Sequence, residues 1–213
     1  SKRQEFNQIN NLEIAKYILE NFKSFKQDIK QEYEVSEFIT HKFNIGNKVV
    51  FKNKEKFEEM NFEWLYHKTF CFDSKLEKDF LQFIEMKKDE IDKIFSDWFV
   101  IRNEGFEEFK IYDNRKDEVT YAMGFEPDFI FFGKKNKDDD NFLSIQCFIE
   151  TKGEHLAMAK DTWKEEFLDT LKGKILTTKD DKNLTLQSLP FFINKDFKMN
   201  DKFVSGFEEF LQS

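Results

Sequence analysis

The stretch that decides the fold is FEPDFIFFGKKNKDDDNFLSIQCFIETK, residues 125–152. Its two apolar runs, Phe125–Phe132 and Phe142–Lys152, have the length and the aromatic and β-branched content of strands, and they are the most strongly predicted strands of the chain. The segment that joins them, Gly133–Asn141, is almost wholly charged, so we expect an exposed loop there. Together these features predict a hairpin.

Side chains alternate between the two faces of a strand, which assigns the residues of the second run. Ile145, Cys147 and Ile149 fall on one face, which we expect to be the core face. Glu150 and Lys152 fall on the other face, two residues apart, where the strand ends. Charged groups that end an apolar strand are costly unless they are paired or used, so this pair is a candidate for function.

A further acid, Asp128, enters the first run directly after Pro127, which restricts the backbone there. The hairpin is expected to place Asp128 at its open end, where Glu150 and Lys152 emerge. Two carboxylates and an ammonium group suit phosphodiester hydrolysis. Oxygen ligands hold Mg²⁺, the ion activates a water molecule, and lysine can orient or deprotonate that water and offset developing charge. The alternative interpretation is a surface ion-pair cluster.

A short motif links this pattern to a known superfamily. Pro127-Asp128, a spacer of 21 residues and Glu150-Thr151-Lys152 match the PD-(D/E)xK nuclease signature. The wider sequence resembles the C-terminal endonuclease domain of the Res subunits of type III restriction enzymes and of related restriction helicases. The resemblance covers about residues 72–195 and is carried by GFEPDFI (124–130), FIETKGEHL (148–156), DTWKEEF (161–167) and SLPFF (188–192).

The resemblance implies a restriction-endonuclease-like α/β fold, with a mixed central sheet flanked by helices. It also implies a metal-dependent deoxyribonuclease with Asp128, Glu150 and Lys152 as catalytic residues. We expect Asp128 and Glu150 to bind Mg²⁺, or Mn²⁺ in its place. The Thr151 carbonyl is expected to join them, because a main-chain oxygen between Glu150 and Lys152 is well placed.

Three further residues have open assignments. The family tends to carry an acid on its first core helix, and Glu77 in SKLEKDF (74–80) matches that position. Glu77 is therefore a fourth candidate catalytic residue, although a capping box with Ser74 explains it equally well. Gln146 and His155 flank the motif, and each either contacts the substrate or has a structural role.

The partners expected from the resemblance are DNA, an ATP-driven helicase or translocase domain of the same polypeptide, and a modification methyltransferase subunit. The sequence contains no Walker lysine motif and starts at Ser1 within a charged stretch, so we expect a piece of a longer protein. The net charge of −8 argues against DNA binding as a stand-alone activity. The alternative function is therefore a catalytically idle nuclease-like fold that docks DNA or protein.

The organisation expected for the chain is a helical extension or the tail of an upstream domain over residues 1–70, followed by the nuclease-like domain over residues 71–213. No apolar run approaches the ~18 residues that would span a membrane, and two cysteines form no disulfide framework, so we expect a cytoplasmic protein without a membrane partner. Besides the hairpin, the patterns predict helices over 10–33, 36–43, 74–96, 162–171 and 203–211, and strands over 49–51, 98–101, 109–112, 119–122 and 184–193, the last at a sheet edge.

Overall fold

The computed structural model describes residues 35–41, 57–71, 74–135, 143–153, 161–178, 183–195, 198–199 and 201–213. The chain divides into two compact units, one formed by residues 1–37 and 112–123 and the other by residues 38–111 and 124–213. The predicted helix over 10–33, the predicted strand over 49–51 and His155 lie outside the described residues. The predicted helix over 36–43 is wrong in its described part, since residues 36–41 have no regular structure.

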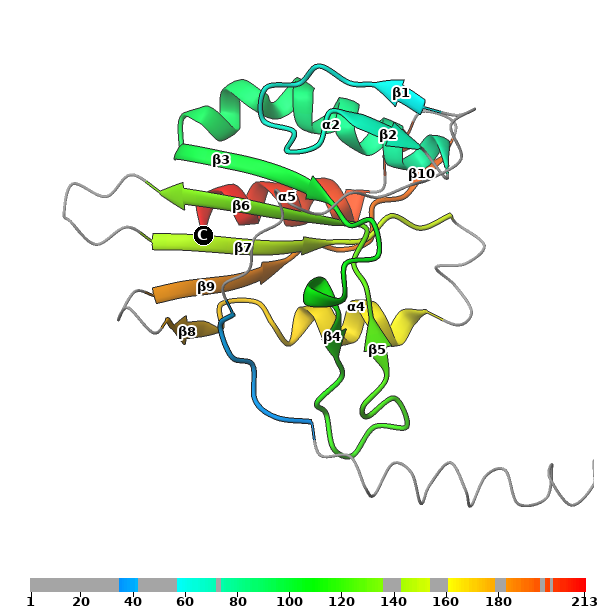
Figure 1. Cartoon of the computed structure of the whole chain (residues 1–213), viewed down its shortest axis with the longest axis vertical. Coiled ribbons are helices and arrows are strands. Elements are labelled where there is room, and N and C mark those ends of the chain that lie inside the picture. The colour runs from blue at the N-terminus through cyan, green and yellow to red at the C-terminus, as the bar shows by residue number, and fades with distance from the viewer. Residues whose placement is uncertain are drawn as a thin grey trace, which may run out of the picture. The chain divides into compact units, whose positions relative to one another are not determined.

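The structure is a mixed α/β fold, as the sequence predicts (Figure 1). Its described helices are α2 (Lys75–Asp92), η2 (Glu107–Phe109, a 3-10 turn), α4 (Thr162–Asp169) and α5 (Asp201–Gln212). Its described strands are β1 (Phe57–Glu59), β2 (Thr69–Cys71), β3 (Phe95–Arg102), β4 (Ile111–Tyr112), β5 (Gly124–Phe125), β6 (Phe129–Lys135), β7 (Leu143–Ile149), β8 (Ile175–Thr177), β9 (Asn183–Ser188), β10 (Asn194–Lys195) and β11 (Lys198–Met199).

The larger unit is built on a five-stranded sheet in the order β3-β6-β7-β9-β8. Strands β6 and β7 form the predicted hairpin and pair antiparallel, from Phe129 opposite Ile149 to Lys135 opposite Leu143. Strand β9 pairs parallel with β7, so the sheet is mixed. The predicted edge position of this late strand is wrong, because β8 covers the outer side of β9. Strand β9 ends at Ser188, before Pro190 could interrupt the pairing.

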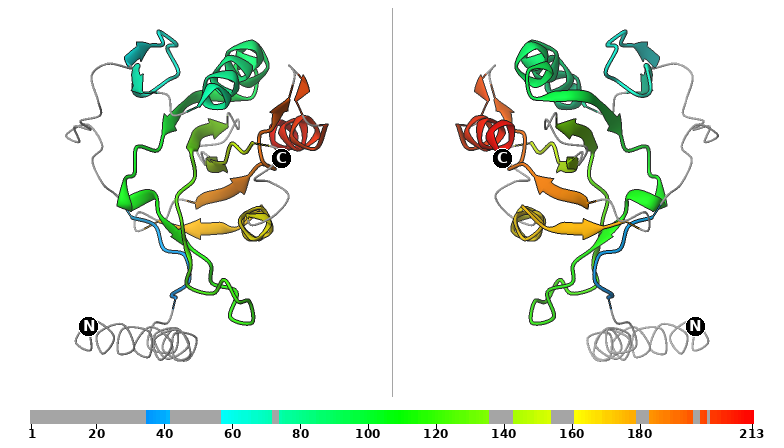
Figure 2. Two further views of the ribbon diagram at one scale, coloured as in Figure 1. Left: turned by 90° about the vertical axis from the view of Figure 1, so that its right-hand side faces the viewer. Right: turned by 90° about the vertical axis from the view of Figure 1, so that its left-hand side faces the viewer.

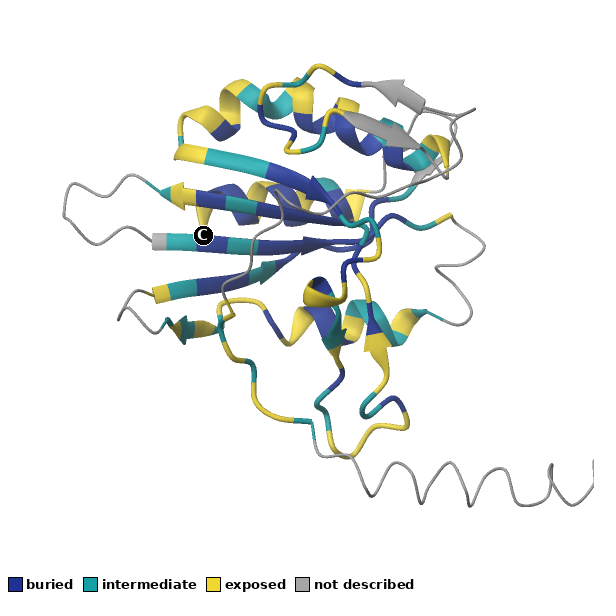
Figure 3. Cartoon of the chain, viewed as in Figure 1, coloured by how far each residue is buried: buried dark blue, intermediate teal, exposed yellow. Residues whose placement is uncertain are grey.

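Both faces of the sheet are covered, and the alternation along β7 decides which residues face which layer. Helices α2 and α5 lie side by side (Figures 1 and 2) and contribute to one apolar cluster, which contains the predicted core residues Ile145, Cys147 and Ile149. Helix α4 contributes to a second cluster, which contains Phe148. The strand end that carries the candidate residues is therefore buried on both sides, and the C-terminal half of β7 is dark blue in Figure 3.

The core of the larger unit includes residues that lie within the predicted N-terminal extension. Met60, Trp64 and Leu65 are buried in the same cluster as α2 and α5. Leu65 forms a parallel bridge with Val100 of β3, and the Trp64 indole donates to Glu85 at 2.6 Å. The compact unit thus begins before the predicted boundary between residues 70 and 71, because these apolar side chains complete its core.

The predicted start of α2 is confirmed, whereas its predicted end is four residues too late. The Ser74 hydroxyl accepts a hydrogen bond from the Glu77 main chain at 3.4 Å and caps the helix. The helix ends at Asp92, and Phe95 already begins β3. The predicted C-terminal helix is confirmed as α5. Among the described residues, no helix combines the length and the apolar character needed to cross a membrane.

In the smaller unit, the predicted strand over 119–122 is wrong, since these residues form turns around Asp113. The Asp113 carboxylate is fully buried and accepts hydrogen bonds from Arg115 and from the Thr120 hydroxyl. The Ala122 main chain donates to the Asp113 carbonyl at 2.8 Å and has a φ of 63°. That left-handed conformation is incompatible with an extended strand.

Candidate active site

The open end of the hairpin brings together Asp128, Glu150 and Thr151, as the sequence predicts. The Asp128 main-chain NH donates to Glu150 Oε2 at 3.2 Å. In return, Asp128 Oδ2 accepts hydrogen bonds from the Thr151 NH at 2.8 Å and from Thr151 Oγ1 at 2.7 Å. The backbone beside each carboxylate therefore donates a hydrogen bond to the other carboxylate. These bonds fix the relative position of the two groups.

The backbone after β7 is held by the segment that follows β9. The Phe192 NH donates to the Glu150 carbonyl at 2.9 Å, and the Lys152 NH donates to the Phe192 carbonyl at 3.0 Å. Thr151 and Phe192 form a parallel bridge between these bonds. As a result, Glu150 is only 2% exposed and Thr151 is 8% exposed. The segment SLPFF (188–192), which is part of the family resemblance, thus binds the backbone of the site residues through Phe192.

Lysine side chains neutralise the buried Glu150. Lys152 Nζ lies 2.9 Å from Glu150 Oε1 and 2.8 Å from Asp161 Oδ2. Lys164 Nζ lies 3.6 Å from each of the same two oxygens. The four charges therefore alternate in sign around a closed ring. The Phe125 ring, 5.1 Å from Lys164 Nζ, flanks the second lysine.

Burial and the contacts within the ring shift the pKa values of its members in different directions. Burial raises the pKa of Glu150 from 4.5 to about 7, with a further contribution from the charge of Asp128 and partial offset by Lys152 and Lys164. Burial alone would lower the pKa of Lys152, but the contacts with Asp161 and Glu150 outweigh it, and the pKa rises above the usual lysine value. The hydrogen bond from Lys152 lowers the pKa of Asp161. Lys152 is therefore an ammonium group at neutral pH.

Asp161 and Lys164 were not among the predicted site residues, because their segment was predicted only to begin the helix over residues 162–171. Asp161 is the N-cap residue of α4 and makes no capping hydrogen bond with its side chain. Glu165 instead accepts a hydrogen bond from the Phe191 NH at 3.2 Å. The sequence signal that could have identified them is the spacing of three residues between Asp161 and Lys164 at the start of a helix. This spacing places both side chains on one face of the helix.

Glu77, the fourth predicted catalytic residue, is buried in an ion pair. Arg102 of β3 donates to Glu77 Oε2 from Nε at 2.8 Å and approaches it with Nη2 at 2.7 Å, and it also pairs with Glu104. Arg102 lies opposite Phe129, which follows Asp128 directly. Glu77 is thus linked to the strand end beside Asp128 through Arg102, and its carboxylate neutralises that guanidinium.

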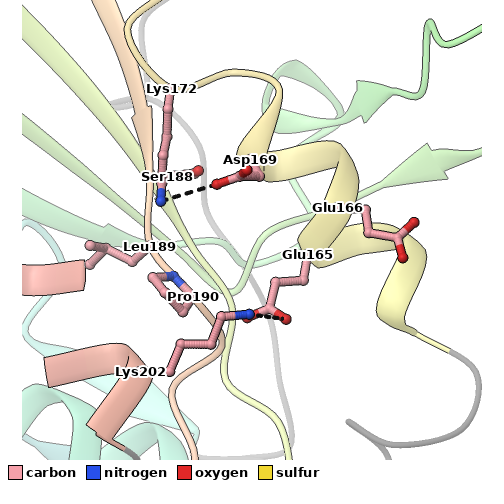
Figure 4. Close-up of a pocket in the computed structure, with 8 residues that line it drawn as sticks. All are labelled: Glu165, Glu166, Asp169, Lys172, Ser188, Leu189, Pro190 and Lys202. Carbon is pink, nitrogen blue, oxygen red and sulfur yellow. Dashed lines mark ion pairs between the residues drawn. The ribbon is translucent and has the colours of Figure 1, made fainter. Parts of the chain in front are cut away.

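A separate pocket of about 210 Å³ runs along α4 (Figure 4) and contains none of the predicted site residues. Its acids and lysines pair with each other, Lys202 with Glu165 at 2.9 Å and Lys172 with Asp169 at 3.1 Å.

Within the described part of the chain, no group of three or more His, Cys, Asp and Glu side chains is arranged to hold a metal ion.

The geometry predicts that two substitutions of Asp128 differ in stability. Asp128→Ala removes the acceptor of both Thr151 hydrogen bonds and leaves a buried NH unpaired, so we expect a loss of about 1–3 kcal/mol. Asp128→Asn keeps an acceptor oxygen and relieves the repulsion with Glu150, so its unfolding free energy should lie within about 1 kcal/mol of the wild type. Urea unfolding in EDTA measures both. Equal losses for the two variants would show that the carboxylate charge itself supports the fold.

Comparison with known proteins identifies two matches. A family model described as HI_1054_C, C-terminal domain, matches residues 43–213. An uncharacterised protein of Haemophilus influenzae is 37% identical over 161 residues, which represent 71% of this chain and 32% of that protein. The chain therefore spans about a third of the length of the curated relative that it matches. No solved structure matches the chain.

Proposed function

This chain belongs to the HI_1054_C C-terminal domain family, and we propose that it is the Mg²⁺-dependent DNA endonuclease domain of a larger restriction-type enzyme. The observation that carries the proposal is the joint position of Asp128 and Glu150 at the open end of the hairpin, with Lys152 bound to Glu150 at 2.9 Å. This is the acid-acid-lysine set that the PD-(D/E)xK signature implies. The reaction would be hydrolysis of a phosphodiester bond.

The donor atoms at this position fit Mg²⁺. Two carboxylates, Glu150 held by the Asp128 NH and Asp128 held by the Thr151 NH, are together with the Thr151 carbonyl oxygen ligands of the kind that Mg²⁺ binds. Mg²⁺ retains several water molecules and needs few protein ligands. Burial and the charge of Asp128 raise the pKa of Glu150 to about 7, so a divalent cation would have to displace a proton from Glu150 below that pH.

The chain's own groups have separate tasks in this proposal. A bound Mg²⁺ would polarise the scissile phosphate and acidify a water molecule. Asp128 and Glu150 would hold the ion, and the hydrogen bonds from Thr151 would keep Asp128 oriented. Lys152 stays protonated, so it would act as a positive charge and hydrogen-bond donor toward the phosphate rather than as a base.

The net charge of −8 disfavours DNA binding by this chain alone, so the proposed function requires that another part of a longer protein delivers the DNA. We propose that a helicase or translocase domain of the same polypeptide supplies the DNA, in the cytoplasm, and that a modification methyltransferase subunit accompanies it. Tethering to such a motor would raise the local concentration of DNA at the site. The coverage of only 32% of the Haemophilus influenzae relative leaves room for such a domain in that protein.

A supercoiled-plasmid assay tests this function. At high protein concentration and low salt, the wild type should nick DNA slowly with Mg²⁺ or Mn²⁺, without sequence preference and without a response to ATP. EDTA and Glu150→Gln should each abolish the nicking. The matched control is Glu208→Gln, which removes the same charge from an exposed position on α5 and should nick like the wild type. Equal residual nicking by all three proteins would point to a contaminating nuclease and favour the idle docking module.

A further inference from the structure

We infer that Asp161 gives the two lysines of the site different roles, fixing Lys152 beside Glu150 and leaving Lys164 to bind a phosphate of the DNA. This inference rests on the nuclease function proposed above. It makes Asp161 a positioning residue and Lys164 a substrate-binding residue, two roles that the PD-(D/E)xK motif does not contain.

The distances separate the two lysines. Lys152 Nζ lies 2.8 Å from Asp161 and 2.9 Å from Glu150, which are the lengths of charge-assisted hydrogen bonds. Lys164 Nζ lies 3.6 Å from the same oxygens, beyond hydrogen-bond range. The Lys164 side chain is also more exposed, at 20% against 14% for Lys152. Lys152 is therefore held by two short contacts, whereas Lys164 makes longer ion pairs with the same two carboxylates.

Once a divalent cation is bound, the net charge of the site favours the binding of an anion. When all five groups are ionised, the carboxylates of Asp128, Glu150 and Asp161 exceed the ammonium groups of Lys152 and Lys164 by one negative charge. A divalent cation between Asp128 and Glu150 would turn this excess into one positive charge, which a single phosphodiester group balances. The same cation would draw Glu150 away from its weaker partner, and that partner is Lys164.

Lysine NH₃⁺ signals in ¹H–¹⁵N NMR spectra test the positioning role without any cleavage. An ammonium group held by two hydrogen bonds exchanges its protons slowly with water, so Lys152 should give a signal and Lys164 should not. Asp161→Ala should remove the Lys152 signal, and Asp161→Glu should preserve it. A Lys152 signal that survives in Asp161→Ala, or a Lys164 signal as protected as that of Lys152, would overturn the inference.

Steady-state kinetics on a short DNA duplex with Mg²⁺ test the division of roles. Lys164→Ala should raise KM about tenfold or more, the effect of losing a charge-assisted hydrogen bond, with kcat nearly unchanged. It should also reduce the slope of log KM against log salt by about one, and Lys164→Arg should restore both. Asp161→Ala should lower kcat about 10–100-fold at constant KM. Lys172→Ala, which removes a surface charge from the segment after α4, is the matched control and should change neither.

The outcomes separate this inference from the proposed function. A loss of kcat at constant KM in Lys164→Ala would overturn the phosphate-binding role while DNA cleavage stands. A wild type that shows the expected NMR signals but no Mg²⁺-dependent cleavage would refute the nuclease function and the role of Lys164 with it. In that case, the positioning of Lys152 by Asp161 would remain as a structural fact.

Discussion

Lys152→Ala should slow Mg²⁺-dependent nicking by about 10²–10³-fold, the usual contribution of one positioned group that stabilises developing charge. The variant removes the ammonium group that lies 2.9 Å from Glu150 and 2.8 Å from Asp161. Lys152→Arg preserves the charge but not the compact geometry of the ammonium group, so it should retain only part of the activity. A Lys152→Ala rate within a few-fold of the wild type would exclude Lys152 from the reaction.

The structure adds a condition to this experiment that the sequence alone does not indicate. Lys152 lowers the pKa of Glu150, so its removal should raise that pKa beyond about 7 and leave Glu150 protonated at neutral pH. Metal binding by Lys152→Ala should then be weak at neutral pH and recover in alkaline solution, because a carboxyl group must ionise to bind the ion. Cleavage should stay low at both pH values if Lys152 acts on the phosphate.

Glu150→Gln should abolish nicking and change how stability depends on pH. The pKa of Glu150 is raised from 4.5 to about 7 in the folded protein, so the folded state holds this proton more tightly than the unfolded chain. As the pH rises from 4.5 to about 7, Glu150 ionises first in the unfolded chain. The unfolding free energy of the wild type therefore falls over this range. The full loss above the folded pKa is about 3 kcal/mol.

Urea unfolding in EDTA at several pH values measures this effect as a difference between two proteins. The unfolding free energy of Glu150→Gln relative to the wild type should increase by about 3 kcal/mol between about pH 4 and pH 8. Glu208→Gln should show no such change, because Glu208 is exposed. Mg²⁺ should stabilise the wild type at pH 8 and not Glu150→Gln. A pH-independent difference would show that Glu150 ionises normally in the folded protein.

The hairpin was predictable because the sequence pattern that specifies it lies within one continuous segment, residues 125–152. Two apolar runs and a charged connection fix β6 and β7, and alternation along β7 identifies Ile149 as a core residue and Glu150 as a site residue. The register then determines that Asp128 meets Glu150, because Phe129 and Ile149 are paired. The same local reasoning failed at the edge of the sheet, where the parallel pairing of β9 with β7 depends on the path of the whole chain.

The charged partners of the site were not predictable for a similar reason. Asp161 meets Lys152 only because α4 begins beside the end of β7, and the spacing of the two residues in the sequence does not indicate this contact. Likewise, the capping signal around Glu77 was correct for the helix, but the ion pair with Arg102 depends on the position of β3. A sequence pattern shows which side chains share a face, whereas the identity of the opposing side chain is a property of the tertiary structure.

The most direct test of the site is the position of a bound ion. A crystal soaked in Mn²⁺ should show one anomalous peak that joins Asp128, Glu150 and the Thr151 carbonyl, with metal-oxygen distances of about 2.1 Å. The peak should be absent from a crystal of Glu150→Gln treated in the same way. An ordered Mn²⁺ bound elsewhere, or no peak between Asp128 and Glu150 while both carboxylates remain paired with the protein, would contradict a metal-dependent nuclease site.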